Sequence, residues 1–343
     1  MSTRIKPARI FSDQLLSHYR QQGDPIADAV IESVVDEQGK GGLRSLMIWL
    51  ADTQDFSTAN QSASVQQFFA QNATLPGWAN TGRMARGMAF FNKYVGPISL
   101  VLGCFSLPYC YLGADGAQVL WLTERIKNDT SQRLQETGEW LFAVNNPAEW
   151  RSTQAVLRTL KVRLIHAGAR WFTRHSGRWN DDWGVPVNQE DMAGTNLAFS
   201  YVVLLGLRKA GITTTDQAEE DYLHHINVIA SLNGLTDELI PDNLRQAYQL
   251  GQTIAKRQFR PSQAGAGLTK SLLEAITRQV AGDKPEATRN LVAGQMRFLM
   301  GDTYADLLDI PQAPLEKRLA GLLTRLPIFP LVAPAPTPGS RRG

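Results

Sequence analysis

The chain has 343 residues, a length that allows one large domain or two ordinary ones. Its 43% hydrophobic and 20% charged residues are typical of a globular protein, and the net charge of +3 comes from scattered lysines and arginines. No basic run indicates a nucleic-acid or membrane surface, and two cysteines, Cys104 and Cys110, exclude a disulfide framework and are not spaced like zinc ligands. We expect both to be buried free thiols.

The N-terminal segment lacks the apolar core of a signal peptide, which predicts a cytoplasmic protein. The most apolar stretch, residues 94–112, is long enough to raise the question of a membrane span. Pro97, Pro108, two glycines and two serines interrupt it. We therefore expect a buried, broken helix here and no membrane segment. The part around Leu100 to Leu112 would suit the wall of a substrate pocket, although ordinary core packing is favoured.

Apolar residues recur at helical spacing along the rest of the chain, without convincing alternating strands or an internal repeat. We predict an all-α fold, a single large helical domain. An N-terminal helical extension (1–79) would pack on a core (80–312), followed by a C-terminal helix (313–330) and a disordered, Pro- and Gly-rich tail (331–343). The predicted helices span residues 24–35, 42–50, 65–71, 118–126, 131–144, 149–172, 188–209, 216–230, 238–257, 267–280, 285–299 and 314–326.

The helix predicted over residues 149–172 carries His166, with Arg163 three residues before it and Arg170 four residues after. These offsets place the three side chains on one face, whereas most other sides of the helix are apolar, which predicts burial. Buried cations are costly unless an anion meets them. The pattern therefore predicts either a cofactor with anionic groups, such as haem with its propionates, or ion pairs with carboxylates such as Glu190 or Asp191.

The segment that begins at Asn188 has a structural explanation and a functional one. Asn188 can cap the predicted helix, and acidic residues suit its first turn. Asp191 and Thr195 are also candidates for contact with a cofactor. Asp191 would then orient His166 or pair with Arg170.

Four ordered segments resemble the family of the latex clearing proteins (rubber oxygenases), which includes the oxygenase of mycophenolic acid biosynthesis. The resemblance covers roughly residues 80 to 310. The segments are SLPYCYLGADGAQVLWLTERI (106–126), QRLQETGEWL (132–141), VRLIHAGARW (162–171) and GVPVNQEDMAGTNLAFSYVVLLGL (184–207), and FLMGDTYADLLDIP (298–311) is a weaker match.

This resemblance implies a globin-like helical core that holds a b-type haem, and an oxygenase that uses O₂. His166 matches the haem-ligating histidine of the family and is thus the predicted iron ligand. Latex clearing proteins cleave a carbon–carbon double bond of polyisoprene and are exported, whereas this chain shows no export signal. We therefore expect an apolar, unsaturated or isoprenoid-like small molecule as substrate, not solid rubber.

The sequence RLQET supplies Arg133, Glu136 and Thr137 as catalytic candidates. The matching segment of the latex clearing proteins carries arginine and then lysine-threonine, so Arg133 and Thr137 match and Glu136 replaces the lysine. A carboxylate near the iron could act as a general base or proton shuttle. Alternatively, Arg133 and Glu136 form a helical ion pair, and Thr137 bonds its own helix backbone.

Three other functions remain open at this point. Glu136 would suit peroxide chemistry on the same haem, and loss of the lysine would suit a haem or lipid carrier without turnover. A non-haem iron site would combine His166 with Glu190 or Asp191, but no second histidine is suitably placed for it. His18, His175, His224 and His225 are expected to be structural.

Overall fold

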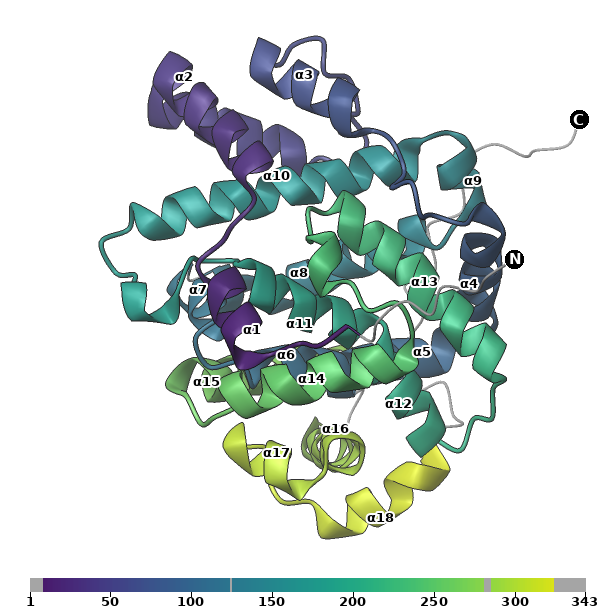
Figure 1. Cartoon of the computed structure of the whole chain (residues 1–343). Coiled ribbons are helices and arrows are strands. Elements are labelled where there is room, and N and C mark those ends of the chain that lie inside the picture. The colour runs from purple at the N-terminus through teal and green to yellow at the C-terminus, as the bar shows by residue number, and fades with distance from the viewer. Residues whose placement is uncertain (1–8, 124, 281–284, 324–343) are drawn as a thin grey trace, which may run out of the picture.

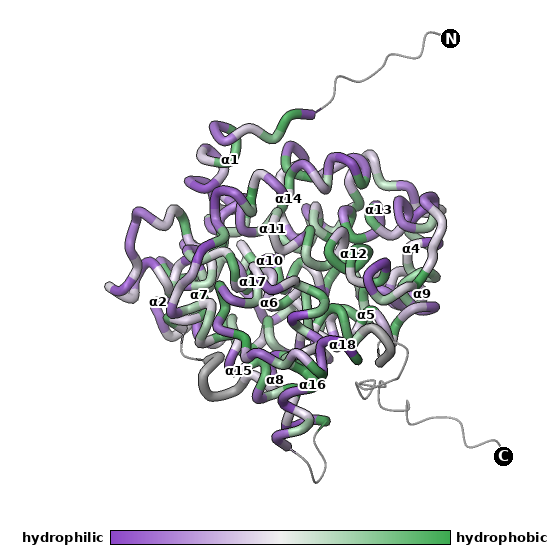
Figure 2. The backbone as a smooth tube through the Cα atoms, turned by 90° about the horizontal axis from the view of Figure 1, so that it is seen from below, coloured by the Kyte–Doolittle hydropathy of each residue, from purple (hydrophilic) through white to green (hydrophobic). Residues whose placement is uncertain are grey.

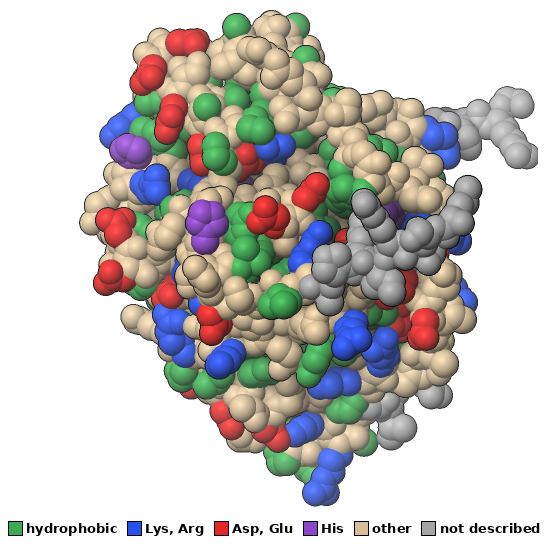
Figure 3. All heavy atoms as spheres, in the orientation of Figure 1, with side chains coloured by type: hydrophobic (Ala, Val, Ile, Leu, Met, Phe, Trp, Pro, Cys, Tyr) green, Lys and Arg blue, Asp and Glu red, His purple; other side chains and the backbone are tan. Residues whose placement is uncertain are grey.

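The computed structural model describes residues 9–123, 125–280 and 285–323. These residues form helices joined by short loops, and no strand occurs among them, so the predicted all-α single domain is confirmed. On the face shown in Figure 3, acidic and basic side chains are interspersed, as the scattered charges predicted.

The helices, including one π-helix (η1) and two 3₁₀ turns (η2, η3), follow one another along the chain as in Figure 1. They are α1 (Asp13–Arg20), α2 (Pro25–Ala51), α3 (Ala63–Asn72), α4 (Thr81–Lys93), α5 (Val95–Val101), η1 (Leu102–Ser106), α6 (Leu107–Tyr111), α7 (Ala117–Leu122), α8 (Arg125–Val144), α9 (Pro147–Arg151), α10 (Gln154–Arg174), η2 (Asp181–Trp183), α11 (Gln189–Phe199), α12 (Tyr201–Lys209), α13 (Asp216–Leu232), η3 (Asp237–Leu239), α14 (Leu244–Gln258), α15 (Gln263–Val280), α16 (Pro285–Met300), α17 (Asp302–Leu307) and α18 (Pro314–Leu323).

Several helix boundaries differ from the predicted ones. The helix predicted over 149–172 is broken at Thr153, whose φ of 65° is left-handed, and becomes α9 and α10. The helix predicted over 188–209 is broken at Ser200 into α11 and α12. Residues 24–35 and 42–50 were predicted as two helices, and α2 accordingly consists of two helical parts separated by a non-helical residue, Gly39 (φ 67°). Helices α1, α4 and α17 were not predicted.

The apolar stretch at 94–112 forms α5, η1 and α6, with Ile98, Val101 and Cys104 in the core. The predicted burial is thus confirmed, but the predicted break does not occur inside the stretch. The helix runs from Val95 to Tyr111 through a π-helical turn, and the non-helical residue, Tyr94, precedes it. Among the described residues, no single helix has the length and apolarity to cross a membrane. One pair would have them together, Thr81–Lys93 with Val95–Tyr111, and it is bent by 82°.

Helix α10 crosses the molecule between two groups of helices. Figure 1 shows α2 and α3 on one side of it and α8 and α13 on the other, and α10 contacts all four. Apolar side chains of α10, among them Leu160 and Leu164, share a core with Ile31 and Leu43 of α2. A second core gathers around α5, α12, α15 and α16, and the largely hydrophobic tube of α12 is visible in Figure 2.

The N-terminal segment therefore packs directly on the helix that carries His166. The division of the chain at residue 80 stays a prediction. Residues 324–343, which include the end of the predicted C-terminal helix and the predicted disordered tail, lie outside the described residues.

A glycine sets the distance between α4 and α13. A Cβ added at Gly87 would lie 2.6 Å from Cβ of His225 and 2.7 Å from the backbone oxygen of Asp221, which cannot rotate away. We expect Gly87→Ala to lower the free energy of unfolding by about 1–3 kcal/mol, measured by urea denaturation. Gly41→Ala is the control, because nothing lies within 4 Å of its added Cβ, and it should be neutral or slightly stabilising. Equal losses in the two variants would contradict this account.

Candidate functional site

His166 lies near the middle of α10 and is half-buried. Its Nδ1 is buried and has no hydrogen-bond partner. Burial, followed by the nearby charge of Arg170, lowers the pKa of His166 to about 4. The imidazole is therefore neutral at physiological pH, which is the form that binds metal ions.

The two arginines beside His166 are paired with carboxylates of the N-terminal segment. Arg163 binds Asp24 through two hydrogen bonds, Nε to Oδ2 at 2.5 Å and Nη2 to Oδ1 at 3.0 Å. Arg170 donates from Nε to Asp28 Oδ1 at 2.6 Å and from Nη1 to the Val187 carbonyl at 3.1 Å. The contacts are thus those of the ion-pair alternative, although the partners are not Glu190 or Asp191. A cofactor-binding role for either arginine stays a prediction.

Local structure brings both carboxylates to α10. Asp24 caps the N-terminus of α2, where its side chain accepts a hydrogen bond from the Ala27 amide, and Asp28 lies in the first turn of the same helix. Two glycines make room for these ion pairs. A Cβ at Gly23 would lie 2.8 Å from Asp28 Oδ2, and Gly234, with φ of 89°, lies directly against the Asp24–Arg163 pair.

Asp191 belongs to a second buried network of charges. It accepts a hydrogen bond from Arg20 of α1 at 3.1 Å, and the same guanidinium lies 3.2 Å from Glu190 and 3.6 Å from Asp115. Burial raises the pKa of Asp191, and the charge of Arg20 opposes that shift. Asp191 therefore pairs with Arg20 and not with Arg170, and the predicted cap is also present, because Asn188 Oδ1 accepts from the Asp191 amide at 2.9 Å.

Several of the predicted site residues lie close enough to α6 to shift the pKa values of its side chains. The charge of Arg133 contributes to the lowered pKa of His166 and also acts on Tyr111, whose pKa burial raises to about 12. The neighbouring thiol, Cys110, has its pKa raised to about 12 by burial, while Thr195 lowers it and Asp191 raises it. The chain thus brings Arg133, His166, Asp191 and Thr195 around α6.

Cys110 and Tyr111 belong to the apolar stretch for which the sequence favoured ordinary core packing over the wall of a substrate pocket, and neither was predicted individually as a site residue. They lie inside one of the segments that resemble the rubber oxygenases, which was the available signal. Cys104 is buried and Cys110 half-buried, and both are free thiols as predicted.

Several side chains of the candidate site are strongly desolvated and yet keep accessible surface. Burial is the largest cause of the pKa shifts of His166, Cys110 and Asp191, yet each of the three side chains keeps accessible surface, and Thr195 is exposed. These accessible side chains come from α6, α10 and α11.

On α8, Glu136 differs from the other two catalytic candidates. Arg133 and Thr137 are half-buried and, four residues apart, share a face. Glu136 is exposed, and its Oε1 accepts a hydrogen bond at 2.8 Å from Gln132, one turn earlier in the same helix. The catalytic roles of all three residues stay predictions.

The remaining histidines have local partners. His18 bonds Gln22, His175 stacks on Trp171 at 4.1 Å, His224 accepts from the Asn80 amide, and His225 Nε2 lies 3.1 Å from the Val144 carbonyl. Within the described ranges, no group of three or more His, Cys, Asp or Glu side chains could hold a metal ion. The non-haem alternative therefore lacks a ligand set in that part of the chain.

Residues 113–327 match the family model described as "ER-bound oxygenase mpaB/B'/Rubber oxygenase, catalytic domain". The match spans more than half of the chain, so the protein belongs to this family of oxygenase catalytic domains and is an oxidoreductase. The predicted resemblance is thereby confirmed.

Two individual proteins agree with the family assignment. A rubber oxygenase from a Streptomyces species is 22% identical over 310 residues, which is 86% of this chain and 72% of the relative. The structure of a latex clearing protein in the closed state aligns with a TM-score of 0.74 and 19% identity, covering 92% of this chain and 86% of the other. The structural likeness supports the fold.

The Asp24–Arg163 pair offers a test of what holds α10 in place. We expect Asp24→Asn to lower the free energy of unfolding by about 3 kcal/mol, because it leaves a buried guanidinium without its counter-charge while keeping a side chain that can cap α2. Asp13→Asn is the control. The Asp13 side chain is 62% exposed and its partner Arg257 keeps its ion pair with Glu190, so a loss of less than about 1 kcal/mol is expected. Urea denaturation measures both values, and a larger loss in the control would overturn the assignment.

Proposed function

We propose that the protein is a haem b-dependent oxygenase that uses O₂ on an apolar, unsaturated or isoprenoid-like small molecule, with His166 as the iron ligand. The observation that carries this proposal is a neutral imidazole that lies deep in the protein, keeps accessible surface and has an unpartnered Nδ1. Membership of an oxygenase family supports the reaction class.

The donor set fits haem better than a bare metal ion. A protein that holds iron directly surrounds it with several side chains, and no such group occurs among the described residues. Haem would bring nitrogen ligands of its own, so that one histidine of the chain would suffice to hold the iron. We propose that such a group lies beside α6, α10 and α11, which carry Cys110, His166 and Asp191.

Bound haem would supply the iron that reacts with O₂. The chain would contribute orientation, because the ion pairs to Asp24 and Asp28 fix the rotation of α10 and thus the direction of the His166 ring. In this proposal Arg163 and Arg170 position the ligand helix and do not meet the propionates. Arg133 would place a positive charge near the ring, within the range over which it already acts on His166.

The proposed substrate class follows from the relatives and from the surroundings of His166. The Streptomyces relative is named a rubber oxygenase, which indicates an apolar, unsaturated substrate for that protein. In this chain, Leu107, Tyr109 and Cys110 of α6 are half-buried and pack against the main core. We propose that their accessible sides form the apolar wall of the substrate site. Thr137, on the same face of α8 as Arg133, would add a hydroxyl.

Haem binding is the first expected outcome. The protein purified from cells with ample haem should show a Soret absorption band, and His166→Ala should abolish it because the axial ligand is lost. His175→Ala is the matched control and should keep the band, since His175 stacks on Trp171 at the end of α10. A colourless wild-type protein, or an unchanged band in His166→Ala, would contradict the proposal. Oxygen uptake that depends on an unsaturated terpenoid then distinguishes an oxygenase from a carrier.

The variant Glu136→Gln tests whether the carboxylate of Glu136 takes part in the reaction as an acid or base. Its exposed carboxylate is bonded to Gln132, so we expect terpenoid-dependent oxygen uptake within about twofold of wild type. Gln132→Ala, which removes the bonded partner, is the control and should behave alike. Loss of peroxide-dependent dye oxidation in Glu136→Gln alone would instead establish the peroxide chemistry that the sequence suggested.

A further inference from the structure

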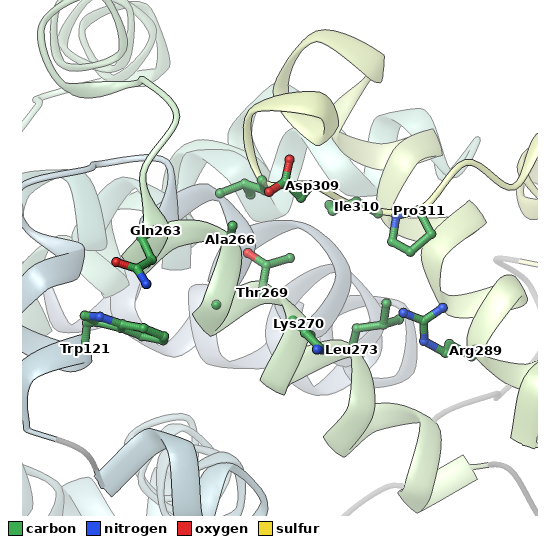
Figure 4. A pocket seen from close by; sticks show the side chains of 12 residues that line it. Trp121, Gln263, Ala266, Thr269, Lys270, Leu273, Arg289, Asp309, Ile310 and Pro311 are labelled. Atoms are coloured by element: carbon green, nitrogen blue, oxygen red, sulfur yellow. The ribbon is translucent and has the colours of Figure 1, made fainter.

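A pocket of about 320 Å³ opens between α7, α15, α16 and the loop that follows α17. Its wall is mostly apolar, and Figure 4 shows Trp121 at one end and Arg289 at the other. Its volume lies at the lower end of the range of about 300–1,000 Å³ for small-molecule sites. The apolar part of its lining is formed by Trp121, Ala266, Leu273, Leu308, Ile310 and Pro311.

Two cations of this pocket have no counter-charge within the described part of the chain. Lys270 of α15 is exposed and Arg289 of α16 is half-buried, and neither forms a hydrogen bond or ion pair there. Arg297, on the same helix as Arg289, does have counter-charges, because it binds Asp302 at 3.0 Å and Asp306 at 2.7 Å. A half-buried guanidinium without a partner is expected to attract an anion.

Asp309, the acidic residue that lines the pocket, is not the counter-charge of either cation. Asp309 is exposed on the loop after α17 and is paired with neither cation. Figure 4 shows its carboxylate on the opposite side of its backbone from Arg289. The pocket therefore combines an apolar wall and an aromatic end with a positive end.

We propose that this pocket binds a small amphiphilic acid, with its apolar chain along the wall towards Trp121 and its carboxylate on Arg289 and Lys270. A planar guanidinium matches a carboxylate through two parallel hydrogen bonds, and the ammonium adds a second charge. The site is separate from His166, which is not among its lining residues. Helix α7 nevertheless leads into α8, so the bound acid would lie beside the elements that carry Arg133.

Calorimetric titration of the full-length protein with octanoate, octan-1-ol and acetate tests this proposal. Octanoate should bind saturably, octanol more weakly, and acetate weakest, because each of the last two lacks one half of the ligand. Arg289→Gln should weaken octanoate binding about tenfold and leave octanol binding unchanged, which also shows that the variant is folded. Trp121→Ala should weaken both. Higher ionic strength should weaken octanoate binding only.

Arg278→Gln is the matched control, because Arg278 is an exposed arginine on α15 that does not line the pocket. It should bind octanoate as wild type does. Absence of saturable octanoate binding, or equal affinity in Arg289→Gln and wild type, would overturn the proposal. So would binding that is lost in His166→Ala and kept in Arg289→Gln, because the acid would then lie beside His166. Failure to bind haem would not change the expected titrations, so the two proposals can fail separately.

Discussion

The charge compensation between α2 and α10 is the constraint on which the rest of the candidate site depends. Arg163 and Arg170 flank His166 on one face of a buried helix, and a guanidinium inside a protein is stable only beside an anion. Asp24 and Asp28 meet this requirement at the start of α2. One of the two arginines precedes His166 and the other follows it. The two ion pairs together therefore fix the rotation of α10 and thereby the side of the helix on which the imidazole lies.

This arrangement gives the N-terminal segment a part in the site. A second buried network also pairs the N-terminal segment with later helices, since Arg20 of α1 lies among Asp115, Glu190 and Asp191. Both networks join the first 28 residues to helices of the matched catalytic domain. A chain without these residues would bury the cations of α10 without their partners, at a cost of several kcal/mol for each unpaired charge, whereas Glu190 of α11 would keep its ion pair with Arg257.

The sequence predicted the local features well and the distant pairings poorly. Helical periodicity and the apolar sides of α10 indicated its burial, and the need for an anion followed from Arg163 and Arg170. The identity of the anion could not follow, because Asp24 and Arg163 are 139 residues apart and Asp24 also has an ordinary role as a helix cap. The breaks at Thr153 and Ser200 have no glycine or proline to indicate them.

Glu136 shows the same limit for function. The resemblance to the rubber oxygenases drew attention to it because a lysine was expected, yet sequence alone does not say which face of α8 a residue presents. The structure places Glu136 with Gln132 on the exposed side, one position away from the face shared by Arg133 and Thr137. Arg133, in contrast, lies near enough to His166 and Tyr111 for its charge to act on the pKa of both.

We propose that His166, held by α10, binds a haem iron. Resonance Raman spectroscopy of the ferrous protein tests it most directly, because an iron–histidine stretching band reports that bond alone. The account predicts such a band in the wild type, its loss in His166→Gly, and its return when imidazole is added to that variant. A band that persists unchanged in His166→Gly would show that another residue binds the iron and would contradict the account.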